Sequence, residues 1–398
     1  MSISKHPNAR IVFAVGPGDT VASFDEWLTG DSKGAATSLT YTAQTLDYCR
    51  DAEVSAWLIS SCARVDLRRH NKLMVENRPK PRALSNSGLG YHLQQLAYAW
   101  SLFRSVRQFK ATHAVVDSGT SHWFVWGLMS LLGVKVYVSF HNTYYTIGHW
   151  RSSLSRDLLR KLDGWFFKHG SDGALGVSQE CITQYVELGG SPARGVVYNA
   201  LFEPQDFADF QPQTLVGDLR IAYVGRLEVD KGVIDLLDAF EQLRKQHPQL
   251  PIHLDCCGNG QAMTRMAERV ASSPHLQGRV NLHGQLDRLA LLAVYRQCHV
   301  VVVPTTSHFM EGFPKVCAEA VLARRPQVIS DAVPTIEGLK EAALIYPCDQ
   351  PKALADALHN LLTSPATYAR AADLSARLRS RFHDPESGLQ HALAAVIR

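Results

Sequence analysis

Two carboxylates in this chain have the spacing and surroundings of a binding site. Glu311 and Glu319 are eight residues apart, in a stretch (300–337) that opens with the apolar run VVVV. A polar loop follows that run, and Pro314 is expected to be the first residue of a helix, where a missing N–H costs nothing. The free N–H groups at such a helix start bind anions. Because carboxylates accept hydrogen bonds from hydroxyl groups, the ligand indicated is a phosphate-bearing sugar or nucleoside.

Two cations precede this stretch in the chain. Arg226 and Lys231 are five residues apart and follow an apolar run at 220–224 that is typical of a strand. Either one alone would most often be surface charge, but beside the Glu311 loop both would converge on the helix N-terminus. Such a convergence can neutralise a diphosphate without a metal, because Arg and Lys make charge-assisted hydrogen bonds to phosphate oxygens. The sequence has no Asp-rich or His/Cys ligand cluster, and we expect no metal cofactor.

The secondary-structure elements that must position these residues alternate between strand and helix along the chain. Short β-branched runs alternate with helix-forming stretches, which predicts mostly parallel sheets covered by helices. The expected fold class is α/β, with two Rossmann-like, doubly wound units. Strands of the second half end at Gly225, Gly258, Gly284 and a threonine-rich loop, so these loops should line one crevice. Strands are expected at 10–15, 54–60, 114–116, 134–140, 173–177, 195–198, 220–224, 252–257, 280–283, 300–303 and 327–330, and helices at 38–51, 91–109, 123–132, 150–170, 233–245, 261–272, 288–297 and 316–323.

Segments rich in proline or charged residues between these elements indicate where one domain ends and the next begins. Residues 203–217 contain two prolines and no clear period, so this segment is the predicted linker. It separates an N-terminal unit at 1–205 from a C-terminal unit at 216–376. Residues 64–82 are rich in Arg, Lys, His and Pro and are expected to form a surface loop. Arg324 and Arg325 are expected either to be exposed or to contact an anion.

Length and composition are those of a globular enzyme. The 398 residues are 46% hydrophobic and 20% charged, enough for two domains with full cores. No signal peptide is visible, and Lys135 with two glycines interrupts the apolar segment 123–140, which favours a buried helix and strand over a membrane span. The eight cysteines form no C-x-x-C pair, which indicates reduced, buried thiols. These features predict a cytoplasmic protein.

The first half of the chain is basic. Residues 1–200 contain 21 Lys and Arg against 15 Asp and Glu, a balance of +6, whereas the whole chain carries +4. The segment 150–170 interleaves basic residues with Leu, Trp and Phe, so it is either an amphipathic helix packed on a sheet or a helix partly buried in a membrane interface. An anionic membrane surface, at the inner face of the cytoplasmic membrane, is therefore a candidate partner. No nucleic-acid-binding motif is present, and none is expected as a partner.

Four motifs of the second half together resemble one family. They are IAYVGRLEVDKG at 221–232, HLDCCGNG at 253–260, VNLHGQ at 280–285 and EGFPKVCAEAV at 311–321. This ensemble is similar to glycosyltransferase family 4, the retaining nucleotide-sugar transferases of the GT-B fold. The first half resembles the family more loosely, at His141 and at Tyr198-Asn199. The resemblance implies two Rossmann-like domains facing a cleft, with the last residues, about 377–398, returning to the first domain.

The resemblance implies roles for the donor-side residues. Gly225, Arg226 and Lys231 would bind the diphosphate of a nucleotide-diphosphate-sugar donor and stabilise the departing nucleotide. Glu319 would hold the ribose hydroxyls, and Glu311 would lie beside the transferred sugar. The start of the helix would complete these contacts through Gly312, Phe313, Pro314, Lys315 and Val316.

Roles for the rest of the site are also implied. Gly258 and Leu286 would approach the base, His141 would reach the donor sugar from the first domain, and Gly16 and Gly18 would lie on the acceptor side. The implied reaction retains the anomeric configuration, with front-face attack by a glycan or lipid-linked acceptor in polysaccharide or glycolipid synthesis. The implied catalytic groups are Glu311, His141, Arg226 and Lys231.

Other functions use the same residues. A GT-B isomerase or phosphorylase would share the phosphate site, and a non-catalytic subunit of a glycan-assembly complex would share the fold. A two-carboxylate hydrolase is a competing use of Glu311 and Glu319. The neighbouring Arg226 and Lys231 favour a diphosphate over a neutral glycoside.

Overall fold

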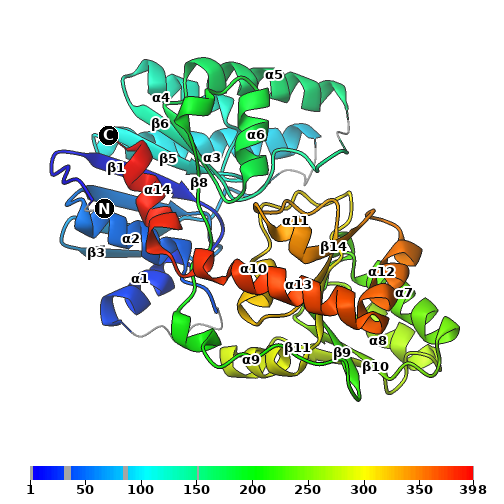
Figure 1. The fold of residues 1–398 in the computed structure, drawn as a ribbon. Helices are drawn as coiled ribbons and strands as arrows, with labels where there is room; N and C mark the ends of the chain where they lie inside the picture. The colour runs from blue at the N-terminus through cyan, green and yellow to red at the C-terminus, as the bar shows by residue number, and fades with distance from the viewer. Residues whose placement is uncertain (1–2, 31–36, 84–87, 150–151, 398) are drawn as a thin grey trace.

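The computed structural model describes residues 3–30, 37–83, 88–149 and 152–397, and within them two β-sheets lie side by side (Figure 1). The N-terminal sheet has the strand order β3-β4-β2-β1-β5-β6-β7-β8, and the C-terminal sheet has the order β11-β10-β9-β12-β13-β14. Neighbouring strands in the two sheets run parallel to each other, except β3 and β4, which are antiparallel. The predicted α/β class with two Rossmann-like units is confirmed.

The first sheet comprises β1 (Arg10–Val15), β2 (Ser55–Ser60), β3 (Asp66–His70), β4 (Leu73–Asn77), β5 (His113–Asp117), β6 (Lys135–Phe140), β7 (Gly173–Gly176) and β8 (Gly195–Val197). The second comprises β9 (Leu219–Val224), β10 (Ile252–Cys257), β11 (Val280–Gly284), β12 (Val300–Val303), β13 (Gln327–Ser330) and β14 (Ala343–Tyr346).

Helices cover both faces of the two sheets (Figure 1). Each strand predicted from the sequence is present to within one residue at either end. No helix among the described residues is both long enough and apolar enough to cross a membrane. The helices are α1 (Thr20–Thr29), α2 (Tyr41–Asp51), α3 (Gly88–Gln108), α4 (Gly127–Leu131), α5 (Leu154–His169), α6 (Gln179–Glu187), α7 (Val233–Gln246), α8 (Met263–Ser272), α9 (Arg288–Gln297), α10 (Lys315–Leu322), α11 (Leu339–Ala342), α12 (Pro351–Thr363), α13 (Pro365–Arg377) and α14 (Leu389–Val396).

The centre of the C-terminal sheet places the chemistry-bearing loops next to one another. Strand β9 pairs with β12 on one side and with β10 on the other. The four valines of β12 are all buried, as expected for a strand covered on both faces. Because β9 and β12 are parallel neighbours, the loops that leave their carboxyl ends, at 225–231 and 304–314, emerge at the same edge of the sheet.

The surface loop predicted at 64–82 is wrong for most of its length. Residues 66–77 form the antiparallel pair β3 and β4. Strand β4 buries Leu73 and Val75 against β2, whereas β3 is a charged edge strand with Arg68 and Arg69 exposed. Edge strands often carry such charge, which leaves no apolar alternation to detect.

Three smaller features of the structure differ from what the sequence predicted. The polar region after the first strand contains α1, whose N-cap Asp19 accepts a hydrogen bond from the Ala22 N–H at 3.0 Å. Strand β14 was not anticipated. Pro314 is the N-cap of α10 and not its first helical residue, because its ψ of 120° is extended.

Arg325 is neither exposed nor an anion contact. Its side chain is 1% exposed and donates to the carbonyl oxygens of Tyr295, Gln211 and Arg296. The contact with Gln211 ties the segment predicted as a linker to the C-terminal sheet. The carbonyl oxygens that surround this guanidinium satisfy its donors in a buried position.

The end of the chain returns to the N-terminal sheet. Helix α14, red in Figure 1, lies beside α2, in blue. The Leu389 N–H donates to Gln44 Oε1 at 2.8 Å, and Gln390 Nε2 donates to Asp51 Oδ2 at 2.8 Å. Both ends of the chain therefore stabilise the same sheet.

Candidate functional site

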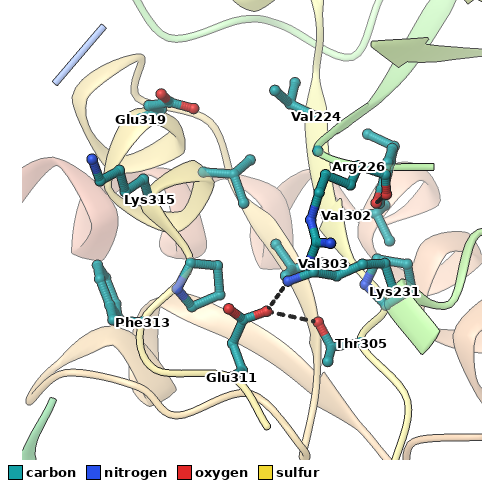
Figure 2. A pocket seen from close by; sticks show the side chains of 15 residues that line it. Val224, Arg226, Lys231, Val302, Val303, Thr305, Glu311, Phe313, Lys315 and Glu319 are labelled. Atoms are coloured by element: carbon teal, nitrogen blue, oxygen red, sulfur yellow. Dashed lines mark hydrogen bonds and ion pairs between the residues drawn. The ribbon is translucent and has the colours of Figure 1, made fainter. Parts of the chain in front are cut away.

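A cavity of about 360 Å³ lies at the carboxyl ends of β9 and β12 (Figure 2). One wall comes from the loop after β9 and the other from the start of α10. The cavity brings together most of the donor-side residues singled out from the sequence. Those that line it are Gly225, Arg226, Lys231, Glu311, Phe313, Pro314, Lys315, Val316 and Glu319.

Lys231 and Glu311 form an ion pair at one side of this cavity. Lys231 Nζ lies 2.5 Å from Glu311 Oε2, and the Thr305 hydroxyl donates to the same oxygen at 3.4 Å (Figure 2). The two side chains are only 17% and 10% exposed. Weak solvent screening strengthens the attraction between them, so each charge fixes the position of the other.

The aromatic ring of Phe309 contacts both cationic side chains, Lys231 and Arg226. Lys231 Nζ lies 3.8 Å from the ring centroid, and Arg226 Cζ lies 5.6 Å from it. Both distances fall within the range of cation–π attraction. Gly232, with φ of 76°, lets the Lys231 turn lie against Pro304, the residue after β12, because a Cβ at this position would lie 1.7 Å from the Pro304 carbonyl oxygen. The turn therefore requires glycine for both conformation and space.

Glu319 lies in the second turn of α10, near the opposite end of the cavity from Glu311 (Figure 2). Its Oε2 accepts from the Tyr295 hydroxyl at 2.5 Å, and its Oε1 accepts from the Thr37 hydroxyl. Burial, with the nearby Glu319 charge, raises the pKa of Tyr295 well above its ordinary value, so the phenol stays a donor. The carboxylate is thus held by two hydroxyl groups, the kind of donor that a ribose also offers.

Lys315 joins α10 to the N-terminal half. Its Nζ donates to Ser38 Oγ at 2.9 Å and lies 4.7 Å from the centre of the Tyr41 ring. Burial lowers the pKa of Lys315, and the charge of Glu319 partly opposes this effect. Residues 37–41 therefore lie against the start of α10, over one end of the cavity.

His141 lies in a neighbouring cavity of about 330 Å³ that Gly16 and Gly18 also line. Its Nε2 is 3.1 Å from Asp117 Oδ2, and its Nδ1 is 3.3 Å from the Tyr198 hydroxyl. These contacts fix the orientation of the imidazole. The three residues that sequence reasoning assigned to the N-terminal side are thus brought together, outside the cavity that holds Lys231 and Glu311.

The two cavities meet at a close backbone contact. A Cβ on Gly312 would lie 2.0 Å from the His141 carbonyl oxygen, and the Thr143 N–H donates to the Glu311 carbonyl oxygen at 3.2 Å. The loop before α10 therefore touches the loop after β6. This contact fixes the spacing between the backbone segments that carry Glu311 and His141.

Gly258 and Leu286, predicted to approach a base, do not line the cavity around Lys231. The Gly258 N–H donates to the Gly284 carbonyl at 2.8 Å, and a Cβ at Gly258 would lie 1.9 Å from the Gly225 carbonyl oxygen. Gly258 thus supports the turn at Gly225 from behind. Its contact with a base stays a prediction.

Several residues of the site were missed by sequence reasoning. Asp117 ends β5, the parallel neighbour of the strand that His141 follows, and this adjacency was a usable signal. Thr305 and Phe309 lie in the threonine-rich loop that was expected to line the crevice, and Tyr198 lies in a pair that resembles the family, but no role was assigned to these three side chains. Thr37 and Tyr295 come from segments with no motif around them, and only packing reveals them.

The arrangement can bind a ligand that carries both phosphate and hydroxyl groups. Two cations and the N-terminus of α10 provide positive potential, and two carboxylates provide hydrogen-bond acceptors. In the part of the chain that the structure describes, no group of three or more His, Cys, Asp or Glu residues is placed to hold a metal ion.

Comparison with known proteins places both halves of the chain in related families. The family described as "Glycosyl transferases group 1" matches residues 218–364, and "Glycosyl transferase 4-like domain" matches residues 34–200. Over 193 residues the chain is 32% identical to a glycogen synthase of Mycobacterium tuberculosis, covering 48% of this chain and 40% of that protein. Over 155 residues it is 30% identical to D-inositol 3-phosphate glycosyltransferase of Corynebacterium glutamicum, covering 38% of this chain and 36% of that protein. The chain spans less than half the length of these curated relatives.

Solved structures share the fold over nearly the whole chain. Anabaena Alr3699/HepE, solved in complex with UDP, matches with a TM-score of 0.65 at 13% identity, over 98% of this chain and 99% of that one. The UDP-forming alpha,alpha-trehalose-phosphate synthase of Burkholderia vietnamiensis matches with a TM-score of 0.72 at 15% identity, over 98% and 99%. At this identity the likeness establishes the architecture, which is the GT-B fold.

Proposed function

Because this chain belongs to glycosyltransferase family 4 and has the GT-B fold, we propose that it transfers a sugar from a nucleoside-diphosphate sugar to a glycan or lipid-linked acceptor, with retention of configuration. One observation carries the proposal. Arg226, Lys231, Glu311 and Glu319 line a single cavity at the start of α10. A structural role for these four residues would not require them to share a cavity.

In this proposal the cations bind the donor diphosphate. Arg226 is exposed at the mouth of the cavity, whereas Lys231 is mostly buried within it. Together with the α10 N-terminus they place positive charge where the leaving group develops negative charge. Glu311, already oriented by Lys231, is positioned to accept hydroxyl groups of the transferred sugar, and Glu319 those of the ribose.

The proposed reaction breaks the bond between the sugar C1 and the phosphate oxygen, whose electron pair passes to the diphosphate. The acceptor oxygen attacks C1 from the same face, and its proton passes to the departing phosphate oxygen. Pre-placed cations stabilise this charge without reorganisation at the moment of reaction. We place the acceptor on the side of Gly16, Gly18 and His141, in the unit formed by residues 1–205 and about 377–398. The donor lies on the unit at 216–376.

A panel of nucleotide sugars tests this function. Incubation with an acceptor extract should give transfer from one donor, with the free nucleoside diphosphate as the second product. An isomerase would convert the nucleotide sugar without any acceptor, and a hydrolase would release free sugar. Product analysis with the acceptor omitted therefore separates the three reactions, and binding of no nucleotide sugar would contradict both transfer and isomerisation.

Replacing Glu319 by alanine is expected to weaken nucleoside diphosphate binding by about ten- to a hundredfold, since hydrogen bonds to a charged group contribute about 1.5–3 kcal/mol. Tyr295→Phe is the matched control, because it removes one hydroxyl donor and keeps the carboxylate. It should weaken binding less. Calorimetric titration measures both variants, and equal losses would indicate that Glu319 acts only through its packing.

Transfer is expected to persist in EDTA. Arg226 and Lys231 supply positive charge at the diphosphate, which is what a divalent cation supplies in metal-dependent transferases. The measurement is the transfer rate after exhaustive chelation, with and without added Mg²⁺ or Mn²⁺. A loss of rate that either metal restores would refute metal independence.

A further inference from the structure

The outer face of α3 carries a row of exposed apolar side chains. Leu89, Leu93, Leu96 and Trp100 recur every three or four residues, so they form one stripe along the helix. Leu89 is 75% exposed and Trp100 is 55% exposed. Such a stripe on a water-facing surface is not expected for a helix whose other face already packs on the sheet.

The neighbouring helices extend this apolar surface. Leu131 is 78% exposed at the end of α4 and is followed by the exposed Leu132. On α5, Leu154 is 93% exposed, and Leu158 and Trp165 follow at helical spacing with more than half of each side chain exposed. Of the exposed large hydrophobic side chains in the described residues, more than half lie on α3, α4, α5 or the residue after α4.

The three helices lie next to one another. The Phe103 ring of α3 packs against Trp126 with 5.2 Å between ring centroids. A Cβ on Gly127, the first residue of α4, would lie 3.6 Å from the Trp165 ring of α5. Figure 1 shows α3, α4 and α5 grouped in the upper part of the molecule. We call the apolar side chains on their outer faces the α3–α5 surface.

The charge around this surface is strongly positive. Helix α3 has no acidic residue and ends with Arg104 and Arg107. Helix α5 has four basic residues, and of its two acidic residues Asp163 is buried. Exposed leucines and tryptophans amid basic side chains are typical of a protein surface that enters the interface of an anionic membrane.

We propose that the α3–α5 surface docks on an anionic lipid bilayer, independently of the transfer reaction. A second copy of the chain fits less well, because a symmetric contact would bring these basic residues against one another. Contact with a bilayer would remove the exposed apolar side chains from water while the cations remain at the lipid headgroups.

The position of the surface relative to the cavities agrees with this orientation. Tyr91 of α3 and Arg156 of α5 line a further cavity of about 490 Å³. Its opposite wall includes His308 and Met310, in the loop that also carries Phe309 and Glu311. Docking would therefore hold this cavity, beside the proposed donor site, next to the membrane surface.

Co-sedimentation with lipid vesicles tests the proposal. The full chain should bind vesicles of phosphatidylcholine and phosphatidylglycerol at low salt, bind pure phosphatidylcholine vesicles at least about tenfold more weakly, and lose affinity as salt rises. The double variant Leu131→Glu, Leu154→Glu should lower the fraction bound at least about tenfold, because it removes two apolar side chains whose burial in the bilayer favours docking.

The matched control is Val65→Glu, Leu289→Glu, which adds the same charge at side chains that are 84% and 78% exposed elsewhere on the molecule. This variant should lose no more than a few-fold in vesicle binding. Nucleoside diphosphate binding should be unchanged in both double variants, which separates this inference from the proposed transferase function. Absence of wild-type binding to the anionic vesicles would overturn the proposal. Equal losses in the two double variants, or a dimer in solution that only Leu131→Glu, Leu154→Glu abolishes, would do the same.

Discussion

Replacing Lys231 by alanine is expected to lower kcat/KM about a hundred- to a thousandfold, the usual cost of one lost contact to developing charge. The ammonium contacts Glu311 and the Phe309 ring, so its removal would take away the proposed diphosphate contact and also release the carboxylate. The measurement is the initial rate of sugar transfer with the donor identified by the panel. Lys245→Ala removes an exposed lysine that pairs with Glu241 and should leave the rate unchanged.

A double variant separates the effect of Lys231 on sugar transfer from its effect on the stability of the fold. Lys231→Ala leaves Glu311 buried without its cation, which by itself destabilises the fold. In the double variant Lys231→Ala, Glu311→Gln, this uncompensated charge is absent, so the melting temperature should return toward that of the wild type. Activity should not return. Recovery of activity in the double variant would show that Lys231 serves stability and not transfer.

Replacing Gly312 by alanine is expected to lower kcat by about a hundredfold or more, since a displacement of about 1 Å can cost that much. The new Cβ would lie 2.0 Å from the His141 carbonyl oxygen and 2.7 Å from Val177 Cγ2. Because both neighbours belong to the N-terminal half, the two halves must move apart at this contact. The proposed diphosphate contacts, Arg226, Lys231 and the start of α10, all lie on the C-terminal half, so nucleotide affinity should fall much less than kcat.

Gly127→Ala is the matched control for this prediction. A Cβ there would meet only the Trp165 and Phe166 rings, at 3.6 and 3.7 Å, which are ordinary contact distances. Steady-state rates and calorimetric nucleotide binding measure both variants. If Gly312→Ala kept full kcat, the contact between the loop before α10 and the loop after β6 would have no part in aligning the site.

Most of the fold could be predicted from the sequence because its parallel strands are short, largely apolar runs that end at glycine or at a polar loop. Val300–Val303 is fully buried and Ile252–Cys257 is buried except for the partly buried His253, and the boundaries of both agree with the structure residue for residue. The hairpin at 66–77 could not be found this way. Its edge strand is charged on both faces, and its pairing with β4 depends on a tertiary neighbour, β2.

Some residues of the candidate site could likewise be predicted from the sequence, and others could not. Residues that project from the ends of adjacent strands, such as Arg226 and Glu311, could be grouped from topology alone. Side chains that reach the site from elsewhere could not. Tyr295 contacts Glu319 from α9, and Thr37 contacts it from the N-terminal half, so both depend on how layers and halves pack together.

Calorimetric titration with UDP, GDP and ADP tests the central claim most directly, that the cavity at Arg226 and Lys231 is a nucleoside diphosphate site. One of the three should bind at one molecule per chain. The affinity should fall about ten- to a hundredfold in Lys231→Ala and in Arg226→Ala, since hydrogen bonds from charged groups contribute about 1.5–3 kcal/mol. Lys245→Ala should bind as the wild type does. Binding of none of the three, or equal affinity in the wild type and both site variants, would contradict the assignment.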